Sequence, residues 1–325
     1  MQFTRRELLR HLPALTAAVA GLPALAQEFP AKQMKFVVPY GAGTTTDGIA
    51  RFFADHVRTL TGQTVIVENR PGALGNIGAE YVAKEKPDGY TVLFSGNNTH
   101  AANVHLFTKL PFDPQKDFVP ITTFARVPYI LVVNPRKVPV KALKEFVAFA
   151  KANPGKMSYP SAAVGSRVAV ELLKPAAGFE AVNVDYKAST QALTDLLSGE
   201  LDFYFSDPSL VMPHIRAGKL TALAVSMNQR VSTAPEVPTV AEQGYPNFNL
   251  FSWLGIWTTA GAPPEAVNAT SRLINRILAT PEGLDMIEKR GLIAFPGTPE
   301  SLRQLQTVDT ETWGRVIRAA GIKPE

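Results

Sequence analysis

The fold is decided by the stretch Phe36-Val37-Val38-Pro39-Tyr40-Gly41-Ala42-Gly43-Thr44-Thr45-Thr46-Asp47-Gly48-Ile49-Ala50-Arg51. Its apolar start, 36–38, predicts a buried strand, and Gly41 and Gly43 let the backbone turn sharply after it. Apolar side chains then recur at helical spacing from Ile49 to Val57. A helix that begins here directs free N–H groups and its positive dipole end into the loop, and the three threonine hydroxyls add donors. The stretch therefore predicts a strand, a glycine loop and a helix, with a loop suited to an anion.

Three interpretations of this loop stay open at this point. Gly41 and Gly43 match two of the three glycines of a dinucleotide-binding fingerprint, and Glu68 follows roughly where a ribose-binding acid would stand. Thr46 replaces the third glycine, and its side chain would keep the backbone from approaching a pyrophosphate. The same loop suits a small carboxylate equally well. The third interpretation is a glycine turn before a capped helix, with no ligand.

The first 26 residues have the features of an export signal. Arg5 and Arg6 belong to a basic head, 12–25 is mildly apolar, and Ala24-Leu25-Ala26 is a small-residue cleavage site. The arginine pair resembles a twin-arginine signal, although Sec signals also begin with arginines, so both routes remain open. No later run reaches the roughly eighteen apolar residues that a membrane span needs. We therefore expect a soluble protein in the periplasm.

Composition narrows the class of protein further. With 325 residues, 46% of them hydrophobic and 19% charged, the chain is long enough and apolar enough for two globular domains. It contains no cysteine, which excludes disulfides, thiolate chemistry and cysteine-based metal sites. Loss of the leader lowers the formal charge from +5 to +3, because the leader holds three arginines and one glutamate. Since these charges are scattered, we expect no nucleic-acid partner. We also expect no metal and no cofactor.

Strands alternate with helices through the first part of the mature chain. The apolar runs 65–68 and 91–95 predict two more strands, each followed by a turn-rich loop and a helix, and this pattern is typical of a parallel sheet with helices on its faces. Ligands bind beyond the carboxyl ends of such strands. Asn97 and Thr99 follow the third strand and are candidate ligand contacts, whereas we interpret His100 as a packing residue.

A second series of strands and helices follows Pro128, between about 140 and 225. Ser161, Ser166 and Arg167 lie between a predicted strand and a predicted helix, facing the same crevice. A positive charge at the start of a helix is unfavourable for the helix dipole. Such a charge is explained at Arg167 if its guanidinium binds an acid through two parallel hydrogen bonds. A solvated surface arginine is the alternative. Asp207 follows another strand and either caps the next helix or holds a ligand group.

The C-terminal part contains a long aromatic strand at 250–258, interpreted as crossing between domains, and two amphipathic helical segments. It has no strand–helix series of its own, so we expect it to pack back on the first domain. The predicted organisation is an export signal at 1–26, a discontinuous lobe at 27–124 and 227–325, and a second lobe at 125–226.

Six separated blocks together resemble a known family. The blocks are Val37-Val38-Pro39-Tyr40-Gly41-Ala42-Gly43, Glu68-Asn69-Arg70-Pro71-Gly72-Ala73-Leu74-Gly75, Lys86-Pro87-Asp88-Gly89-Tyr90-Thr91, Ala192-Leu193-Thr194-Asp195-Leu196-Leu197-Ser198-Gly199, Pro213-His214-Ile215-Arg216-Ala217-Gly218-Lys219-Leu220 and Val237-Pro238-Thr239-Val240-Ala241-Glu242-Gln243-Gly244. In this order they resemble the Bug-type extracytoplasmic receptors of tripartite tricarboxylate transporters. The resemblance spans nearly all of the mature chain.

The resemblance implies a periplasmic binding protein with two α/β lobes, of the type II kind, that close over a small organic acid. It implies that the loop after the first strand holds the carboxylate, and that a Gly-Ser loop of the second lobe contributes. In this sequence those positions are Tyr40, Gly41, Ala42, Gly43, Thr44, Thr45 and Asp47 in the first lobe, and Gly165 and Ser166 in the second. The sequence departs from the family at Ala169-Val170, where a His-Leu pair is common, and at Asp185, where proline is common.

The sequence therefore favours a monomeric receptor, not an enzyme, that delivers a dicarboxylate or an aromatic carboxylate to membrane transporter subunits. The alternative is an exported oxidoreductase that binds NAD or NADP through 41–46. The incomplete glycine fingerprint and the lack of an evident acid–base pair count against it. A hydrolase is also disfavoured, because the sequence contains no Gly-x-Ser-x-Gly motif.

Overall fold

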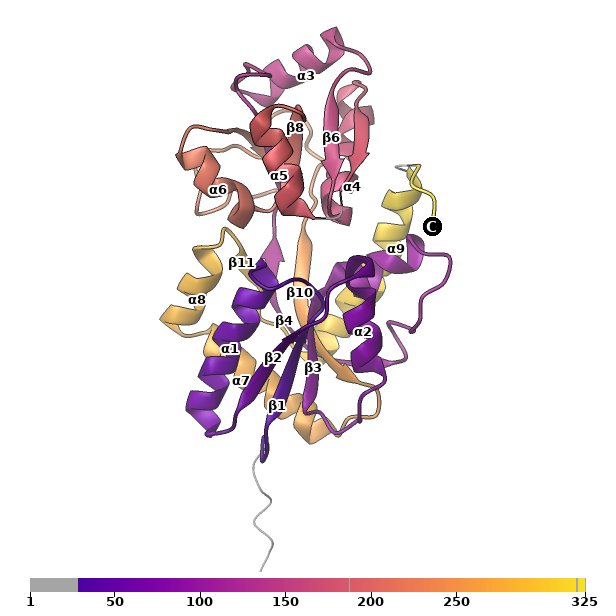
Figure 1. The fold of residues 1–325 in the computed structure, drawn as a ribbon, viewed down its shortest axis with the longest axis vertical. Helices are drawn as coiled ribbons and strands as arrows, with labels where there is room; N and C mark the ends of the chain where they lie inside the picture. The colour runs from indigo at the N-terminus through magenta and orange to yellow at the C-terminus, as the bar shows by residue number, and fades with distance from the viewer. Residues whose placement is uncertain (1–28, 187, 320, 325) are drawn as a thin grey trace, which may run out of the picture.

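Two α/β lobes lie one above the other, and the chain passes between them near β4 and β10 (Figure 1). The computed structural model describes residues 29–186, 188–319 and 321–324, so the leader predicted at 1–26 lies outside the described residues. We call the part built on the six-stranded sheet lobe 1, and the part built on a three-stranded and a two-stranded sheet lobe 2. None of the helices in these residues combines the length and apolar character needed to cross a bilayer.

The sheet of lobe 1 is mixed, with strand order β11-β4-β10-β3-β1-β2. Its strands are β1 (Met34–Val38), β2 (Val65–Asn69), β3 (Thr91–Gly96), β4 (Phe118–Val127), β10 (Ser252–Thr259) and β11 (Ile293–Ala294). β1 pairs in parallel with β2 and β3, as the predicted strand–helix alternation requires. β10 returns from lobe 2 and runs antiparallel to both β3 and β4. β10 therefore carries the chain from lobe 2 into the sheet of lobe 1, in agreement with its interpretation as a crossing strand.

Helices cover both faces of this sheet. They are α1 (Thr45–Thr61), α2 (Asn76–Ala83), α7 (Pro264–Leu278), α8 (Pro281–Glu288) and α9 (Pro299–Ala319), with short helical turns at Ala73–Gly75, Asn98–Ala102 and Asn103–His105. Phe53 of α1 and Ile274 of α7 pack with Phe94 on one face, and each is fully buried. Burial of each such side chain contributes about 1.5 to 3 kcal/mol. The C-terminal helices thus pack on lobe 1.

Lobe 2 contains two small sheets. β5 (Ile130–Val133) pairs antiparallel with β8 (Phe203–Ser206) and β9 (Thr221–Val225), whereas β6 (Ser158–Ser161) pairs in parallel with β7 (Val182–Asp185). The helices are α3 (Leu143–Ala152), α4 (Val164–Ala177), α5 (Ser189–Ser198) and α6 (Pro208–Arg216). The backbone carbonyl of Ser158 accepts a hydrogen bond from the N–H of Asp202, just before β8. Pro160, two residues on, faces the same side of β6 but has no N–H to donate. This explains why β6 does not join β8 in one ladder.

The two segments that link the lobes are bonded to each other by Ser226. Its N–H donates to the carbonyl of Tyr129 at 2.9 Å, and its hydroxyl accepts from the N–H of Tyr129 at 2.9 Å. The same hydroxyl donates to the carbonyl of Leu250 at 2.6 Å, and the N–H of Leu250 donates to the carbonyl of Ser226 at 2.9 Å. Since Tyr129 precedes β5 and Leu250 precedes β10, both linking segments are held at one point.

A second contact between the lobes lies on the side of α8 and α6. Gly291 follows α8 in lobe 1, and a Cβ atom placed on it would lie 2.4 Å from Cβ of Pro208, the first residue of α6 in lobe 2. The same position would lie 3.0 Å from Oγ1 of Thr233. Neighbouring residues Val231 and Ala234 belong to the core of lobe 2. A glycine is therefore what permits this close approach.

We expect Gly291→Ala to weaken this contact between the lobes. The matched control is Gly218→Ala, because φ is +72° at Gly291 and +67° at Gly218, while a Cβ at Gly218 would meet nothing within 4 Å. Both variants carry the left-handed backbone cost of about 1 to 2 kcal/mol. In denaturant unfolding, the free energy of unfolding of Gly291→Ala should be lower by a further amount of about 1 to 3 kcal/mol, or X-ray scattering should show a larger radius of gyration. Identical behaviour of the two variants would contradict the contact.

Candidate functional site

The loop between β1 and α1 is open to solvent. Ala42, Gly43 and Thr44 are exposed, and a Cβ atom at Gly41 or Gly43 would meet nothing within 4 Å. Gly43 has a φ of +80°, a conformation that favours glycine. Thr44 caps α1, because its hydroxyl accepts from the N–H of Asp47 at 3.4 Å and donates to the carbonyl of Gly41 at 2.8 Å. The predicted anion loop is thus a preformed helix N-terminus with free space beside it.

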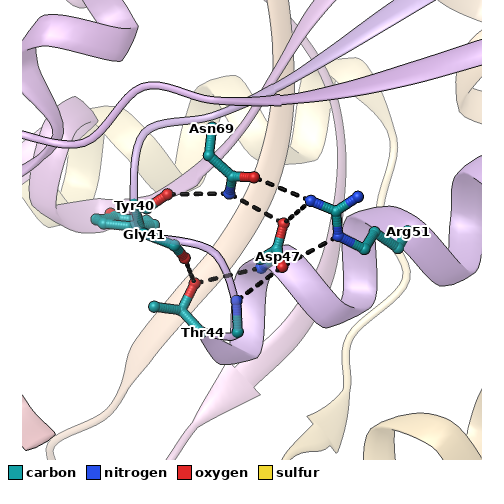
Figure 2. Close-up of polar contacts among 7 residues, drawn as sticks. Tyr40, Gly41, Thr44, Asp47, Arg51 and Asn69 are labelled. Atoms are coloured by element: carbon teal, nitrogen blue, oxygen red, sulfur yellow. Dashed lines mark hydrogen bonds and ion pairs between the residues drawn. The ribbon is translucent and has the colours of Figure 1, made fainter.

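Asp47 is buried at the centre of a network that holds this loop (Figure 2). Oδ2 accepts from the N–H of Gly43 at 2.9 Å and from Nε of Arg51 at 3.1 Å. Oδ1 accepts from Nδ2 of Asn69 at 2.9 Å and lies 2.9 Å from Nη2 of Arg51. Asn69 also donates to the carbonyl of Tyr40 at 3.1 Å. Both carboxylate oxygens of Asp47 are therefore engaged by the protein, which assigns it to shaping the loop.

The charge state of Asp47 follows from these contacts. Burial alone would raise the pKa of its carboxyl, but the hydrogen bonds from Arg51, the Gly43 N–H and Asn69 outweigh burial, so that the pKa lies below its usual value. Asp47 is consequently ionised at neutral pH. Because Arg51 neutralises its charge, the carboxylate does not oppose an anion at the end of α1.

The segment after β3 is buried more deeply than predicted. The Thr99 hydroxyl lies 2.7 Å from the Ser95 hydroxyl and 2.7 Å from Nδ1 of His100, and it donates to the Gly96 carbonyl at 3.2 Å. Its hydrogen-bonding capacity is thus used inside lobe 1. Asn97 is 1% exposed, and its Nδ2 has no hydrogen-bond partner among the residues that the structure describes. Of the two predicted contacts, Asn97 is the one with a free donor.

His100 is a core residue, in agreement with its interpretation as a packing side chain. It is fully buried and stacks on Trp257, with ring centroids 3.7 Å apart. Burial lowers the pKa of its imidazole to about 3, so the ring is neutral throughout the physiological range. This leaves no role for His100 as a cation that would bind a carboxylate.

The candidates at the start of α4 lie in different environments. The Ser166 hydroxyl is buried and donates to the Phe205 carbonyl at 2.5 Å. Gly165 lies against Tyr129, since a Cβ there would be 2.0 Å from the Tyr129 hydroxyl oxygen. The Ser161 hydroxyl donates to Asp185 at the ends of β6 and β7. These contacts tie the start of α4 to β8 and to the segment that links the lobes.

Arg167 is partly buried, and its Nε has no hydrogen-bond partner in the described part of the chain. It lies near Asp185: the hydrogen bonds from Ser161 and Asn183, together with the charge of Arg167, hold the pKa of the Asp185 carboxyl below its usual value. No carboxylate oxygen of the described residues forms a salt bridge with Arg167. Its guanidinium thus keeps hydrogen-bonding capacity for a further acceptor.

Asp207 brings the two lobes together through its neighbour Ser209. It is the N-cap of α6, where Oδ1 accepts from the N–H of Ser209 at 2.7 Å. The hydroxyl of Ser209 lies 2.7 Å from the hydroxyl of Thr45, the first residue of α1. The N-termini of α1 and α6 therefore meet, and their dipoles direct positive ends toward the same region.

Three tyrosines lie near Asp207 or near one another. Tyr129 is close enough to Tyr40, Tyr204 and Asp207 for each of them to affect its ionisation. Burial raises the pKa of the phenols of Tyr40, Tyr129 and Tyr204, so all three remain neutral hydrogen-bonding groups. The Tyr129 hydroxyl lies 2.5 Å from that of Ser252. Lobe 1, the linking segment and lobe 2 thus each contribute a phenol.

The sequence predicted no role in the site for Asn69, Tyr129, Tyr204 or Ser209. Ser209 could have been found, because it stands two residues after a strand-end aspartate at the start of a helix, a place where side chains cap or bind. Tyr129 and Tyr204 carry no such signal, since aromatic residues beside strands are usually core. Asn69 lies 22 residues from Asp47 and reaches it only through the pairing of β1 with β2.

Comparison with known proteins places this geometry in a family. The profile described as "Tripartite tricarboxylate transporter family receptor" (TctC) matches residues 49–322. The chain belongs to this receptor family. The protein BugT of Bordetella pertussis is 32% identical to it over 99% of both chains.

Solved structures agree with this assignment. The Rhodopseudomonas palustris protein Rpa4515, solved with adipate, has a TM-score of 0.86 and 31% identity over 92% of this chain and 100% of its own. MatC from the same species, solved with bound malate, has a TM-score of 0.79 and 28% identity over 89% of this chain and 100% of its own. The resemblance to Bug-type receptors and the two-lobed fold are thereby confirmed. The family consists of solute-binding receptors, so the receptor is not an enzyme.

The oxidoreductase alternative loses its main support in the structure. Glu68, the proposed ribose-binding acid, pairs with Arg70 at 2.5 Å and lies 3.8 Å from Lys35. Its carboxylate therefore belongs to an ion cluster on β1 and β2. Together with the family assignment, this leaves the glycine loop as an anion-binding candidate without a dinucleotide.

We expect Asp47→Ala to destabilise the receptor by about 2 to 3 kcal/mol, because it leaves Asn69, Arg51 and the Gly43 N–H without their acceptor. Asp55→Ala on the same helix is the matched control: the Asp55 side chain is 74% exposed, and the change should cost less than about 0.5 kcal/mol. Denaturant unfolding measures both. Equal losses in the two variants would contradict the role assigned to Asp47.

The pH dependence of this effect has a defined sign. Because the folded pKa of Asp47 is depressed, its contribution is complete above the unfolded value of about 3.9 and is lost as pH falls through the lower folded value. The stability difference between the wild type and Asp47→Asn should therefore shrink as the pH falls from about 5 toward 2. A difference that is constant over this range would show that the charge of Asp47 is not involved.

Proposed function

We propose that this receptor binds a small organic acid, a dicarboxylate or an aromatic carboxylate, between its lobes and delivers it to a tripartite tricarboxylate-type membrane transporter. The observation that carries the proposal is the open loop at Gly41–Thr44 in front of α1, facing the N-terminus of α6 in lobe 2. Two helix N-termini that point toward one region favour an anion there. Adipate and malate in the structures of similar proteins support the same ligand class.

In this proposal, one carboxylate of the ligand accepts hydrogen bonds from the first turn of α1 and from the Thr45 hydroxyl. Asn97 has a free donor that adds no charge, and the three phenols stay neutral. Arg167 and lobe 2 meet the other end of the ligand. A bound acid thereby contacts both lobes and shifts the population toward the closed arrangement. The receptor acts as a monomer in the periplasm, exported on the leader at 1–26 by the twin-arginine or the Sec route.

A thermal-shift screen tests the proposed function. The purified mature receptor is heated with adipate, malate, citrate, benzoate, NAD or NADP in separate samples. An acid present at a hundred times its dissociation constant should add about 2.7 kcal/mol of stability, which is a visible shift. Stabilisation by NAD or NADP alone, with none by an acid, would contradict the receptor proposal.

The role of Arg167 has its own test. Arg167→Ala should weaken binding of a dicarboxylate such as adipate by about tenfold to a hundredfold. The reason is that charge-assisted hydrogen bonds between a guanidinium and a carboxylate contribute about 1.5 to 3 kcal/mol of binding free energy. The monoamide of the same acid lacks the second charge and should lose much less. Arg136→Ala, an exposed arginine after β5, is the control and should change neither affinity. Equal losses for diacid and monoamide would remove Arg167 from the site.

A further inference from the structure

The turn at Ala73–Gly75, between β2 and α2, has an unusual backbone. φ is +133° at Gly72, +46° at Ala73, +52° at Leu74 and +93° at Gly75. Glycine adopts such values freely, but Ala73 and Leu74 are the two residues other than glycine that have a positive φ in the described part of the chain. A left-handed conformation is unfavourable for a residue with a Cβ atom, and for a bulky side chain it is an outlier. The turn is therefore strained at Leu74.

Tertiary contacts hold this turn beside the anion loop. Nδ2 of Asn103, which is fully buried, donates to the carbonyl of Leu74 at 3.3 Å. A Cβ atom at Gly75 would lie 2.7 Å from Cγ2 of Thr99, after β3, and 3.5 Å from Cε1 of Tyr40, after β1. The turn itself follows β2, which is parallel to β1. Leu74 thus lies near the carboxyl ends of these strands, where a parallel sheet binds ligands.

Core packing does not explain the strain at Leu74. Its side chain is 43% exposed and belongs to none of the three hydrophobic clusters formed by the described residues. A glycine at this position would accept the same hydrogen bond from Asn103 without strain. The exposed leucine side chain is therefore what the strained conformation presents. Strained residues that the surrounding structure holds in place cluster at sites that bind ligands.

We propose that Leu74 is a specificity-determining residue of the receptor, which contacts the hydrocarbon part of the bound acid. The inference rests on the proposed function, in which the first turn of α1 and Arg167 hold the ends of the ligand. It adds the class of acid: the hydrocarbon part of the ligand carries no hydroxyl group. The hydroxyl of Thr99, beside the turn, is already engaged by Ser95 and His100. Neither Leu74 nor Thr99 thus offers a partner to a hydroxyl of the ligand.

A leucine discriminates against a ligand hydroxyl because the hydroxyl loses its water without gaining a hydrogen bond. An apolar contact of this kind gives a preference of about tenfold to a hundredfold. Four pairs of acids differ in one hydroxyl: succinate and malate, adipate and 3-hydroxyadipate, tricarballylate and citrate, and benzoate and 3-hydroxybenzoate. The wild type is titrated with all eight in a calorimeter. In the pair with the highest affinity, the member without the hydroxyl should bind more tightly.

Leu74→Asn tests the contact without a risk to folding. Asparagine adopts the left-handed conformation more readily than leucine, so the melting temperature should stay the same or rise by about 1 to 3 °C. The variant removes the apolar side chain, so the affinity for the acid without the hydroxyl should fall by about fivefold to twentyfold. The preference within the pair should shrink at the same time, because the ligand hydroxyl then has a polar neighbour.

Two further variants separate the side chain from the backbone strain. Ala73 is exposed and has the same left-handed conformation as its neighbour Leu74. Ala73→Asn therefore relieves similar strain but leaves the leucine in place, and its affinities should equal those of the wild type. Leu74→Met keeps an apolar side chain on the left-handed backbone, and it should retain the preference for the acid without the hydroxyl.

The outcomes distinguish this inference from the proposed function. Equal affinities within the tightest pair, or tighter binding of its hydroxylated member, overturn the inference alone. A preference that is unchanged in Leu74→Asn, or that is lost equally in Ala73→Asn, does the same. Failure of all eight acids to bind overturns the proposed function and the inference together.

Discussion

The ion pair between Asp47 and Arg51, with Asn69 beside it, is the interaction on which the site depends. It joins the loop after β1, the first turn of α1 and the end of β2 into one rigid unit. A glycine loop without this support would sample many conformations, because glycine loses the most backbone entropy on ordering. Asp47 supplies that support while Arg51 cancels its charge. The loop is therefore ordered, open and still favourable for an anion.

The junction between the lobes follows a similar logic. Ser226 holds the two linking segments together, and the phenol of Tyr129 packs against Gly165, where a side chain would not fit. On the α6 side, Gly291 lets lobe 1 approach Pro208 closely. The glycine at position 165 lets the linking segment approach α4, and the glycine at position 291 lets the two lobes meet at α6. Hydroxyls and phenols then provide neutral hydrogen-bonding groups that suit an anionic ligand without competing with it.

Much of the fold could be predicted from the sequence because it depends on local patterns. The apolar run before Gly41 and the helical spacing after Gly43 predict β1 and α1, and Gly62 ends α1 in the left-handed conformation expected of a C-terminal glycine. The division of lobe 2 into two sheets was not predicted, since it depends on which side of β6 Pro160 faces. A sequence pattern does not contain that orientation.

The site was less predictable because its contacts join distant residues. Asp47 is an acidic residue at a place where a ligand-binding acid is expected. Its carboxylate is instead bonded to Asn69, which reaches it through the pairing of β1 with β2. Thr99 likewise follows a strand end, but its hydroxyl turns inward to Ser95 and His100. Ser209 gains its significance only from Thr45, 164 residues away. Strand ends thus indicate the region of a site, whereas tertiary packing decides which side chains remain free to bind.

A crystal structure of the receptor with the acid that stabilises it most is the most direct test of the central claim. We expect a carboxylate at the N-terminus of α1, within hydrogen-bond distance of the Thr45 hydroxyl, with residues of both lobes around the ligand. A carboxylate bound outside the junction, or held by one lobe without contact to the loop at Gly41–Thr44, would contradict it.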